Sequence, residues 1–238
     1  MKREQVFVTS KLWNSFHAKK SVVAACRESL HDLKLDCLDL YLMHWGVATP
    51  ENEPEPLDSN GVLIAEHVPV RETWEAMQEL VKKGLVKAIG VSNFTAPMLI
   101  DLLSYAEVPP AVNQIELHPY LQQTSLVEFC RYKGIAVTGY SPLGRPGYPE
   151  TKAELLKEDV IRHIAERDGR MSAQIVLRWG IQRGTIVIPK SVHPERIREN
   201  IGVFDFELTR EDMDAIARLE RRFRFCNPEE WWKVPYFG

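Results

Sequence analysis

The chain has 238 residues, of which 45% are apolar, so its length and composition suffice for one sizeable hydrophobic core. Its 30 basic and 33 acidic residues give a formal net charge of −3 without any basic run, which argues against nucleic acid as a partner. The four cysteines are scattered, and neither an apolar leader nor an 18-residue apolar stretch is present, so we expect a soluble cytoplasmic protein without disulfides, zinc cluster or membrane contact.

Short β-branched runs alternate along the chain with longer segments of helical periodicity. The predicted strands cover 6–9, 38–43, 86–91, 111–117, 135–140 and 185–188. The predicted helices cover about 18–34, 70–83, 95–105, 123–133, 158–167, 172–183, 194–201 and 209–219. A long loop over about 46–68 contains the turn signal Ser59-Asn60-Gly61. The alternation predicts six βα units around a parallel sheet, in a single domain over 1–238 that ends in an aromatic tail, 222–238.

Polar residues follow or end each of the six predicted strands. They are Ser10-Lys11, His44-Trp45, Ser92-Asn93, the group Asn113, Gln114, Glu116 and His118, then Tyr140-Ser141, and Lys190-Ser191. Functional groups of a parallel barrel gather at the carboxyl ends of its strands. The sequence therefore predicts a site built from the loops on one face.

Lys11 and His44 stand at the ends of consecutive predicted strands. A histidine at the open end of a barrel can donate a hydrogen bond to a carbonyl oxygen, and a lysine there can stabilise a developing anion. Considered alone, His44 is more simply explained as a histidine at the edge of the core, and Lys11 as a solvated lysine. Taken as a pair, they favour a catalytic role.

The segment from Lys190 to Asn200 combines a strand end with a helix start. Pro194 suits the first helical turn, and Arg196 lies within it, so Lys190, Arg196 and the helix amides predict an anion site. An ordinary capped helix with surface charge is the equal alternative.

Three further polar groups leave alternatives open. Ser92, Asn93 and Gln114 suit a planar amide, or are buried polar residues satisfied by backbone. Tyr140 suits ring stacking, although an aromatic residue there more often packs. Glu116 and His118 share a strand face, but no third ligand stands nearby and no metal site is predicted. The aromatic tail either covers a pocket or seals the barrel rim, and the rim is favoured.

Several of these segments, in their order, resemble the aldo-keto reductase family. The segments are Thr9-Ser10-Lys11-Leu12-Trp13, 38–45 from Leu38 to Trp45, 84–94 from Gly84 to Phe94, 112–120 from Val112 to Tyr120, Tyr140-Ser141-Pro142-Leu143-Gly144, Ile188-Pro189-Lys190-Ser191, and Pro194 to Asn200. The resemblance covers essentially the whole chain, and the ending from Arg224 to Phe237 is similar to the xylose-reductase branch.

The resemblance implies a TIM (β/α)8-type barrel that reduces aldehydes and ketones with NADPH and is monomeric. It implies that Lys11 tunes a tyrosine proton donor, that His44 orients the carbonyl and that Trp45 lines the substrate pocket. The implied NADP(H)-binding residues are Ser92, Asn93, Gln114, Tyr140, Ser141, Leu143, Lys190, Ser191, Val192, Arg196, Glu199 and Asn200. Lys190 and Arg196 favour the 2′-phosphate of NADP.

The chain also departs from the family pattern. The family's Asp and Tyr lie in a motif resembling G-x-R-x-x-D-x-A-x-x-Y, which has no counterpart here, and Tyr41 should face away from His44. We therefore expect an incomplete barrel that lacks two N-terminal βα units, roughly 70 residues, with impaired catalysis, low stability and self-association. Gly46 replaces the usual proline, His193 stands where a small hydroxyl residue is common, and the loop Gly144–Glu150 is short.

Two other functions remain open at this point. One is a non-catalytic NADP-binding or regulatory barrel protein. The other is a different barrel enzyme that takes a phosphorylated substrate at the Lys190–Arg196 segment. The physiological substrate is not encoded in these motifs, because small apolar changes in a pocket alter specificity by only about 1–3 kcal/mol.

Overall fold

A computed structural model describes residues 2–51, 53, 56–146 and 154–238. Within these ranges six strands are present, and their order in the sheet follows their order in the chain: β1 (Thr9–Leu12), β2 (Leu38–Met43), β3 (Val86–Ser92), β4 (Val112–Glu116), β5 (Ala136–Tyr140) and β6 (Ile186–Val187). The helices are α1 (Lys19–Leu33), α2 (Val70–Lys82), α3 (Ala96–Leu103), α4 (Thr124–Tyr132), α5 (Asp159–Asp168), α6 (Ser172–Gln182), α7 (Pro194–Ile201), α8 (Arg210–Ala217) and α9 (Pro228–Trp232). The predicted α/β class is confirmed, whereas the incomplete eight-unit barrel remains a prediction.

Contacts divide the chain into two compact units. Unit 1 consists of Met1–Asn113, Tyr132–Ile135 and Asn227–Gly238, and unit 2 consists of Gln114–Arg131 and Ala136–Cys226. Each unit contains part of the predicted site, so the two parts are described separately.

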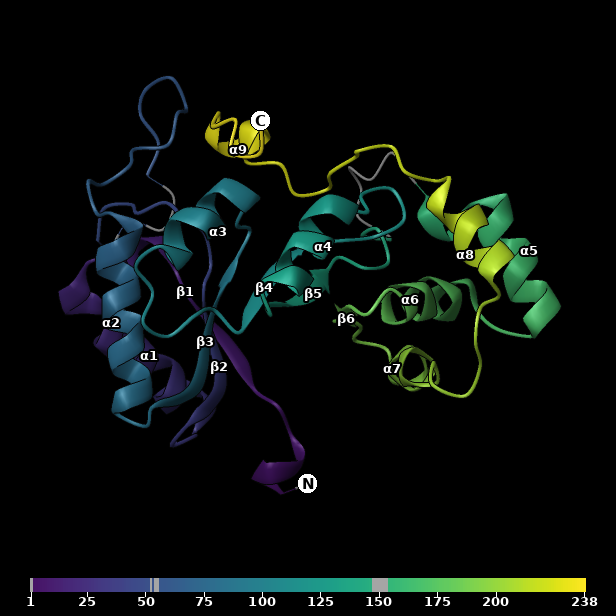
Figure 1. Cartoon of the computed structure of the whole chain (residues 1–238), viewed down its shortest axis with the longest axis horizontal. Coiled ribbons are helices and arrows are strands. Elements are labelled where there is room, and N and C mark those ends of the chain that lie inside the picture. Colours follow the sequence, from purple (N-terminus) through teal and green to yellow (C-terminus); the bar gives the residue numbers. More distant parts are fainter. Residues whose placement is uncertain (1, 52, 54–55, 147–153) are drawn as a thin grey trace. The chain divides into compact units, whose positions relative to one another are not determined.

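In unit 1, β1, β2 and β3 run parallel, with Lys11 opposite Leu42 and Leu42 opposite Gly90. Helices α1 and α2 pack against one another, α1 also contacts β1, and α2 contacts β3 (Figure 1). Every residue of β2 is buried, as expected for a parallel strand covered on both faces. On one face, Leu40 and Leu42 form a core cluster with Val112.

The first strand begins three residues later than predicted. The apolar run 6–9 predicted it, but β1 covers Thr9–Leu12, and Phe7 is 71% exposed. The reason is the position of the partner strand, because β2 begins only at Leu38. The first amides of β2 that bond to this segment, those of Asp39 and Leu40, both donate to the Val8 carbonyl, so the described residues before Val8 have no backbone partner in β2. Lys11 consequently lies inside the strand rather than after it.

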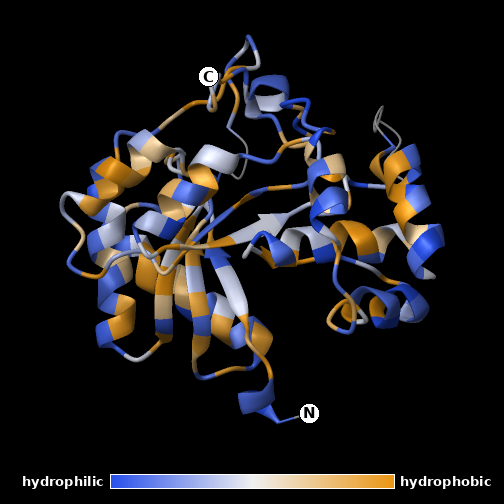
Figure 2. Cartoon of the chain, turned by 45° about the vertical axis from the view of Figure 1, so that its right-hand side comes forward, coloured by the Kyte–Doolittle hydropathy of each residue, from blue (hydrophilic) through white to orange (hydrophobic). Residues whose placement is uncertain are grey.

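In unit 2, β5 and β6 pair in parallel, with Thr138 opposite Ile186. The observed β6 has only two residues, shorter than the predicted 185–188, whereas α7 has the predicted bounds. Helix α5 packs against α6 and α8. Figure 2 shows the helices with hydrophilic and hydrophobic sides, the amphipathic pattern from which they were predicted. The short helix α9, in unit 1, was not predicted.

Candidate active site

Lys11 is the third residue of β1, and His44 directly follows the last residue of the neighbouring strand β2 in unit 1. The backbone amide of His44 donates to the carbonyl of Leu12 over 3.1 Å, which fixes His44 just beyond the β1–β2 pairing. Burial lowers the pKa of Lys11. Burial, and then the positive charge of Lys11, lower the pKa of His44 to about 4. The two side chains are therefore close enough to interact, and a neutral imidazole is available at neutral pH as a hydrogen-bond donor.

Two tryptophan rings flank His44. The Trp13 ring meets the imidazole edge-on, with ring centroids 5.0 Å apart, and the Trp45 ring is nearly parallel to it at 6.2 Å. Trp45 was a predicted site residue, but Trp13 was not, although it follows Lys11 by two positions. The aromatic pair gives the surroundings of His44 an apolar character that suits a carbonyl compound.

The aromatic tail packs on Trp45. Trp232 and Tyr236 meet the Trp45 ring at centroid distances of 5.2 and 5.1 Å, and Phe237 lies 6.1 Å away. The hydroxyl of Tyr236 accepts a hydrogen bond of 2.9 Å from the Gly46 amide. Contact with Trp45 favours the covering role for the tail over the rim role that the sequence favoured.

The loops after β2 and β3 are joined by Asn93. Its backbone is left-handed, with φ of 63°, and its side-chain amide donates to the His44 carbonyl over 3.0 Å and to the Ser92 hydroxyl over 3.3 Å. Both residues are buried. The Asn93 side chain thus bonds to backbone, as expected if it is a buried polar residue satisfied by the barrel. Binding of a carboxamide by Ser92 and Asn93 stays a prediction.

Tyr41 is turned away from this part of the site. It is 1% exposed, and its hydroxyl bonds to Ser29 of α1, on the helix-covered side of the sheet. Burial raises its pKa. The prediction that Tyr41 faces away from His44 is confirmed, whereas its lack of a catalytic role stays a prediction.

In unit 2, Gln114 is buried in β4 and Tyr140 is half-buried at the end of β5. Burial, and then the charge of Glu116, raise the pKa of Tyr140, whose hydroxyl bonds to the Cys226 side chain. Ser141 follows with a left-handed φ of 49°, and its carbonyl accepts from the Gly144 amide over 2.9 Å. Half-buried Leu143 lies within this turn. The rest of the loop Gly144–Glu150, from 147 on, lies outside the described residues.

The predicted anion site lies at the start of α7. Lys190, Val192 and Arg196 are exposed, and the N-cap residue His193 makes no side-chain bond to the helix amides. Ser191, Glu199 and Asn200 are half-buried. Two cations beside uncapped first-turn amides match the requirements of a phosphate group.

Glu116 and His118 bond to one another rather than forming a metal site. The carboxylate lies 2.9 Å from the His118 ring nitrogen, and both side chains are fully buried. In the described ranges, no three His, Cys, Asp or Glu side chains gather closely enough to hold a metal ion.

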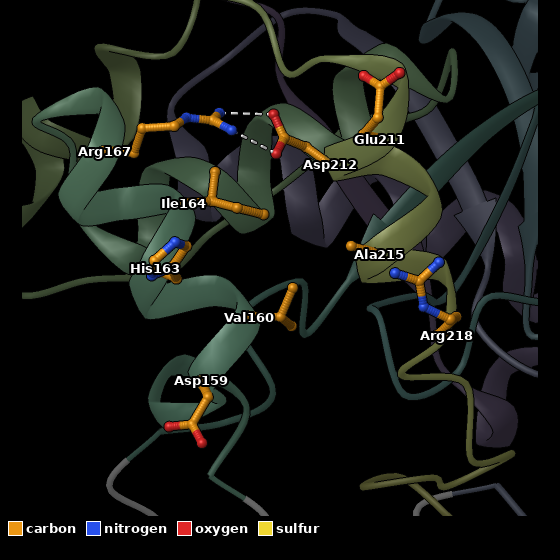
Figure 3. A pocket seen from close by; sticks show the side chains of 9 residues that line it. All are labelled: Asp159, Val160, His163, Ile164, Arg167, Glu211, Asp212, Ala215 and Arg218. Carbon is orange, nitrogen blue, oxygen red and sulfur yellow. Dashed lines mark hydrogen bonds and ion pairs between the residues drawn. The ribbon is translucent and has the colours of Figure 1, made fainter.

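A hollow of about 540 Å³ lies between α5 and α8 in unit 2 (Figure 3). It contains none of the predicted site residues, and the guanidinium of Arg167 on its wall binds both oxygens of Asp212 at 2.8 and 2.7 Å. The hollow is therefore not part of the candidate site. Among the described helices, none has both the length and the apolar character needed to cross a bilayer.

The comparisons with known proteins agree with this geometry. The model of the aldo/keto reductase family matches residues 1–221. The chain belongs to the aldo/keto reductase family. It is an oxidoreductase enzyme.

Two relatives and one solved structure show the extent of the likeness. The chain is 46% identical to aldose reductase B of Dictyostelium discoideum, covering 100% of this chain and 76% of that protein. It is 43% identical to the NAD(P)H-dependent D-xylose reductase I,II of Candida tropicalis, with coverages of 100% and 78%. The structure of aldose reductase from Giardia lamblia superposes with a TM-score of 0.95 at 42% identity, with coverages of 100% and 80%. These identities lie far above the level at which only the fold is shared.

Proposed function

We propose that this aldo/keto reductase reduces an aldehyde or ketone, such as a sugar or an aliphatic or aromatic carbonyl, to the alcohol with NADPH. The observation that carries the proposal is the pair Lys11 and His44, with a His44 pKa of about 4. A neutral imidazole keeps one ring N–H, which can donate a hydrogen bond to the carbonyl oxygen. The apolar rings of Trp13 and Trp45 on either side exclude water and strengthen that bond.

The lysine acts on the charge that develops during reduction. As the carbonyl carbon accepts a hydride, its oxygen becomes an alkoxide, and the Lys11 ammonium stabilises that negative charge. The proton that completes the alcohol comes from an acidic hydroxyl, which in the family motif is a tyrosine. Because these 238 residues contain no counterpart of that motif, we expect slow turnover by the chain alone.

Residues of unit 2 fit the cofactor. NADPH, when bound, supplies the hydride. The half-buried Tyr140 ring would stack on the nicotinamide, and Gln114 would hold its carboxamide. The exposed Lys190 and Arg196 beside the uncapped α7 amides would bind the 2′-phosphate. A relative named as NAD(P)H-dependent supports a nicotinamide cofactor.

The test is NADPH oxidation by the purified chain with a generic aldehyde, beside the same chain fused to an N-terminal barrel segment that carries the family's tyrosine motif. We expect NADPH binding by both proteins and substantial turnover only by the fusion. Comparable turnover by the chain alone would mean that another group donates the proton.

A non-catalytic NADP-binding protein is the second candidate, favoured by the missing tyrosine motif. It requires NADPH binding without turnover even after fusion. If neither the chain nor its fusion bound NADPH, both proposals would be overturned. The four cysteines are free thiols, which agrees with a cytoplasmic location for either function.

A further inference from the structure

The strongest unassigned feature is the buried carboxylate of Glu116 at the end of β4. One oxygen accepts from the backbone amide of Phe225 over 2.7 Å and from the His118 ring over 2.9 Å. The other accepts from the amide of Cys226 over 3.0 Å. The two amides belong to residues 109 and 110 positions further along the chain. One carboxylate therefore fixes two consecutive peptide groups of a distant segment.

Neighbouring contacts hold the same segment. The Phe225 ring meets the buried His118 ring edge-on at 5.0 Å. The Phe225 carbonyl accepts from Arg145 over 3.1 Å, and the Cys226 side chain bonds to Tyr140, the residue proposed to stack on nicotinamide. Glu116 lies at the centre of these contacts, because its carboxylate binds both peptide amides.

After Cys226 the aromatic tail continues as Asn227–Gly238, which belongs to unit 1. Within unit 1, that tail packs on Trp45 through Trp232 and Tyr236. The Phe225 and Cys226 peptide groups, which Glu116 binds, thus directly precede the segment that packs on Trp45.

A buried charge is a poor choice for stability alone. Removing a carboxylate from water often costs more free energy than its hydrogen bonds recover, so a well-packed apolar side chain is often equally stable. Hydrogen bonds to a charged group, however, fix the positions of their partners sharply. We propose that Glu116 is a positioning residue that fixes the start of the aromatic tail and thereby sets the affinity for bulky carbonyl substrates. This inference rests on the proposed function.

The replacement Glu116→Gln keeps the shape of the side chain and changes its bonding. A carboxylate only accepts, whereas an amide nitrogen only donates, so one of the Phe225 and Cys226 amides would face another donor. We expect amide hydrogen exchange at these two residues to accelerate at least tenfold. Glu128→Gln, an exposed change on α4, is the matched control and should leave both exchange rates unchanged.

Binding to the NADP⁺-loaded chain tests the specificity claim. Glu116→Gln should weaken benzaldehyde binding at least threefold, while acetaldehyde and NADP⁺ affinities change less than twofold, because neither ligand needs the tail. Unchanged exchange, or equal weakening for both aldehydes, would overturn the inference. Absence of NADP⁺ binding by the unmodified chain would instead refute the proposed function, and the exchange result would still decide whether Glu116 anchors the tail.

A second pair of variants covers the case in which Glu116→Gln does not fold. Cys226→Pro removes one of the two amide donors and leaves Glu116 intact, and Cys226→Ser keeps the donor but alters the thiol. Faster exchange at Phe225 and weaker benzaldehyde binding are expected for the proline variant and not for the serine variant. The opposite pattern would assign the effect to the thiol and contradict the role of Glu116.

Discussion

At the scale of single residues, the chemistry depends on a histidine that stays neutral. Since burial and the charge of Lys11 lower the His44 pKa to about 4, the imidazole should take up a proton only well below its ordinary pKa of 6.5. Lys11→Met removes the lysine charge but leaves the burial, so the His44 pKa should rise but remain below 6.5. NMR titration of the imidazole C–H signal measures this, with Lys83→Met, an exposed change, as control. A fall in the pKa, or no change, would show that the two side chains do not interact.

Gly46 gives a second prediction at this scale, because it stands in place of the family's usual proline. Its amide donates to the Tyr236 hydroxyl, a bond that a proline could not make. Tyr236→Phe should lower the free energy of unfolding by about 1 kcal/mol. Gly46→Pro removes the same bond and also requires the flexible end of Met98 to shift, so it should cost at least as much. In denaturant unfolding, the two changes should be less than additive because they remove one shared bond. Full additivity would exclude the bond.

At the scale of elements, β3 and β4 approach too closely for any side chain at Gly90. A Cβ at that position would lie 2.6 Å from the Val112 carbonyl oxygen, which is backbone and cannot turn aside. Gly90→Ala should therefore lower the free energy of unfolding by about 1–3 kcal/mol. The control is Gly134→Ala, where φ is positive but nothing lies within 4 Å, and which should cost about 1 kcal/mol. Equal costs in denaturant unfolding would mean that β4 moves aside freely.

Local sequence patterns predicted those elements whose signals are themselves local. The bounds of β2 and α7 were predicted to the residue, because an apolar run and a proline-initiated helix are defined by their own residues. The start of β1 was wrong because it depends on where β2 begins. Likewise, local sequence could not assign Glu116 a role, since the Phe225 and Cys226 amides that it binds lie more than a hundred residues away. Lys11 and His44 were predicted as a pair because parallel strand ends converge.

At the scale of the whole molecule, the described part of unit 2 carries several large apolar side chains that are more than half exposed. Helix α7 has no buried residue, yet Ile197 and Ile201, one turn apart, are 52% and 73% exposed. Ile186 of β6 and Phe204 after α7 are also more than half exposed. Exposed apolar side chains of this size favour association.

We therefore expect two copies of the chain to associate through α7 at micromolar concentrations. The double variant Ile197→Lys and Ile201→Lys should shift the equilibrium to monomer, because the charges would have to be desolvated on contact. Sedimentation velocity over a range of concentrations measures this. Ile100→Lys on α3, at a similarly exposed apolar position, is the control and should leave association unchanged. If the unmodified chain is a monomer throughout, or if the control dissociates equally, α7 is not the contact.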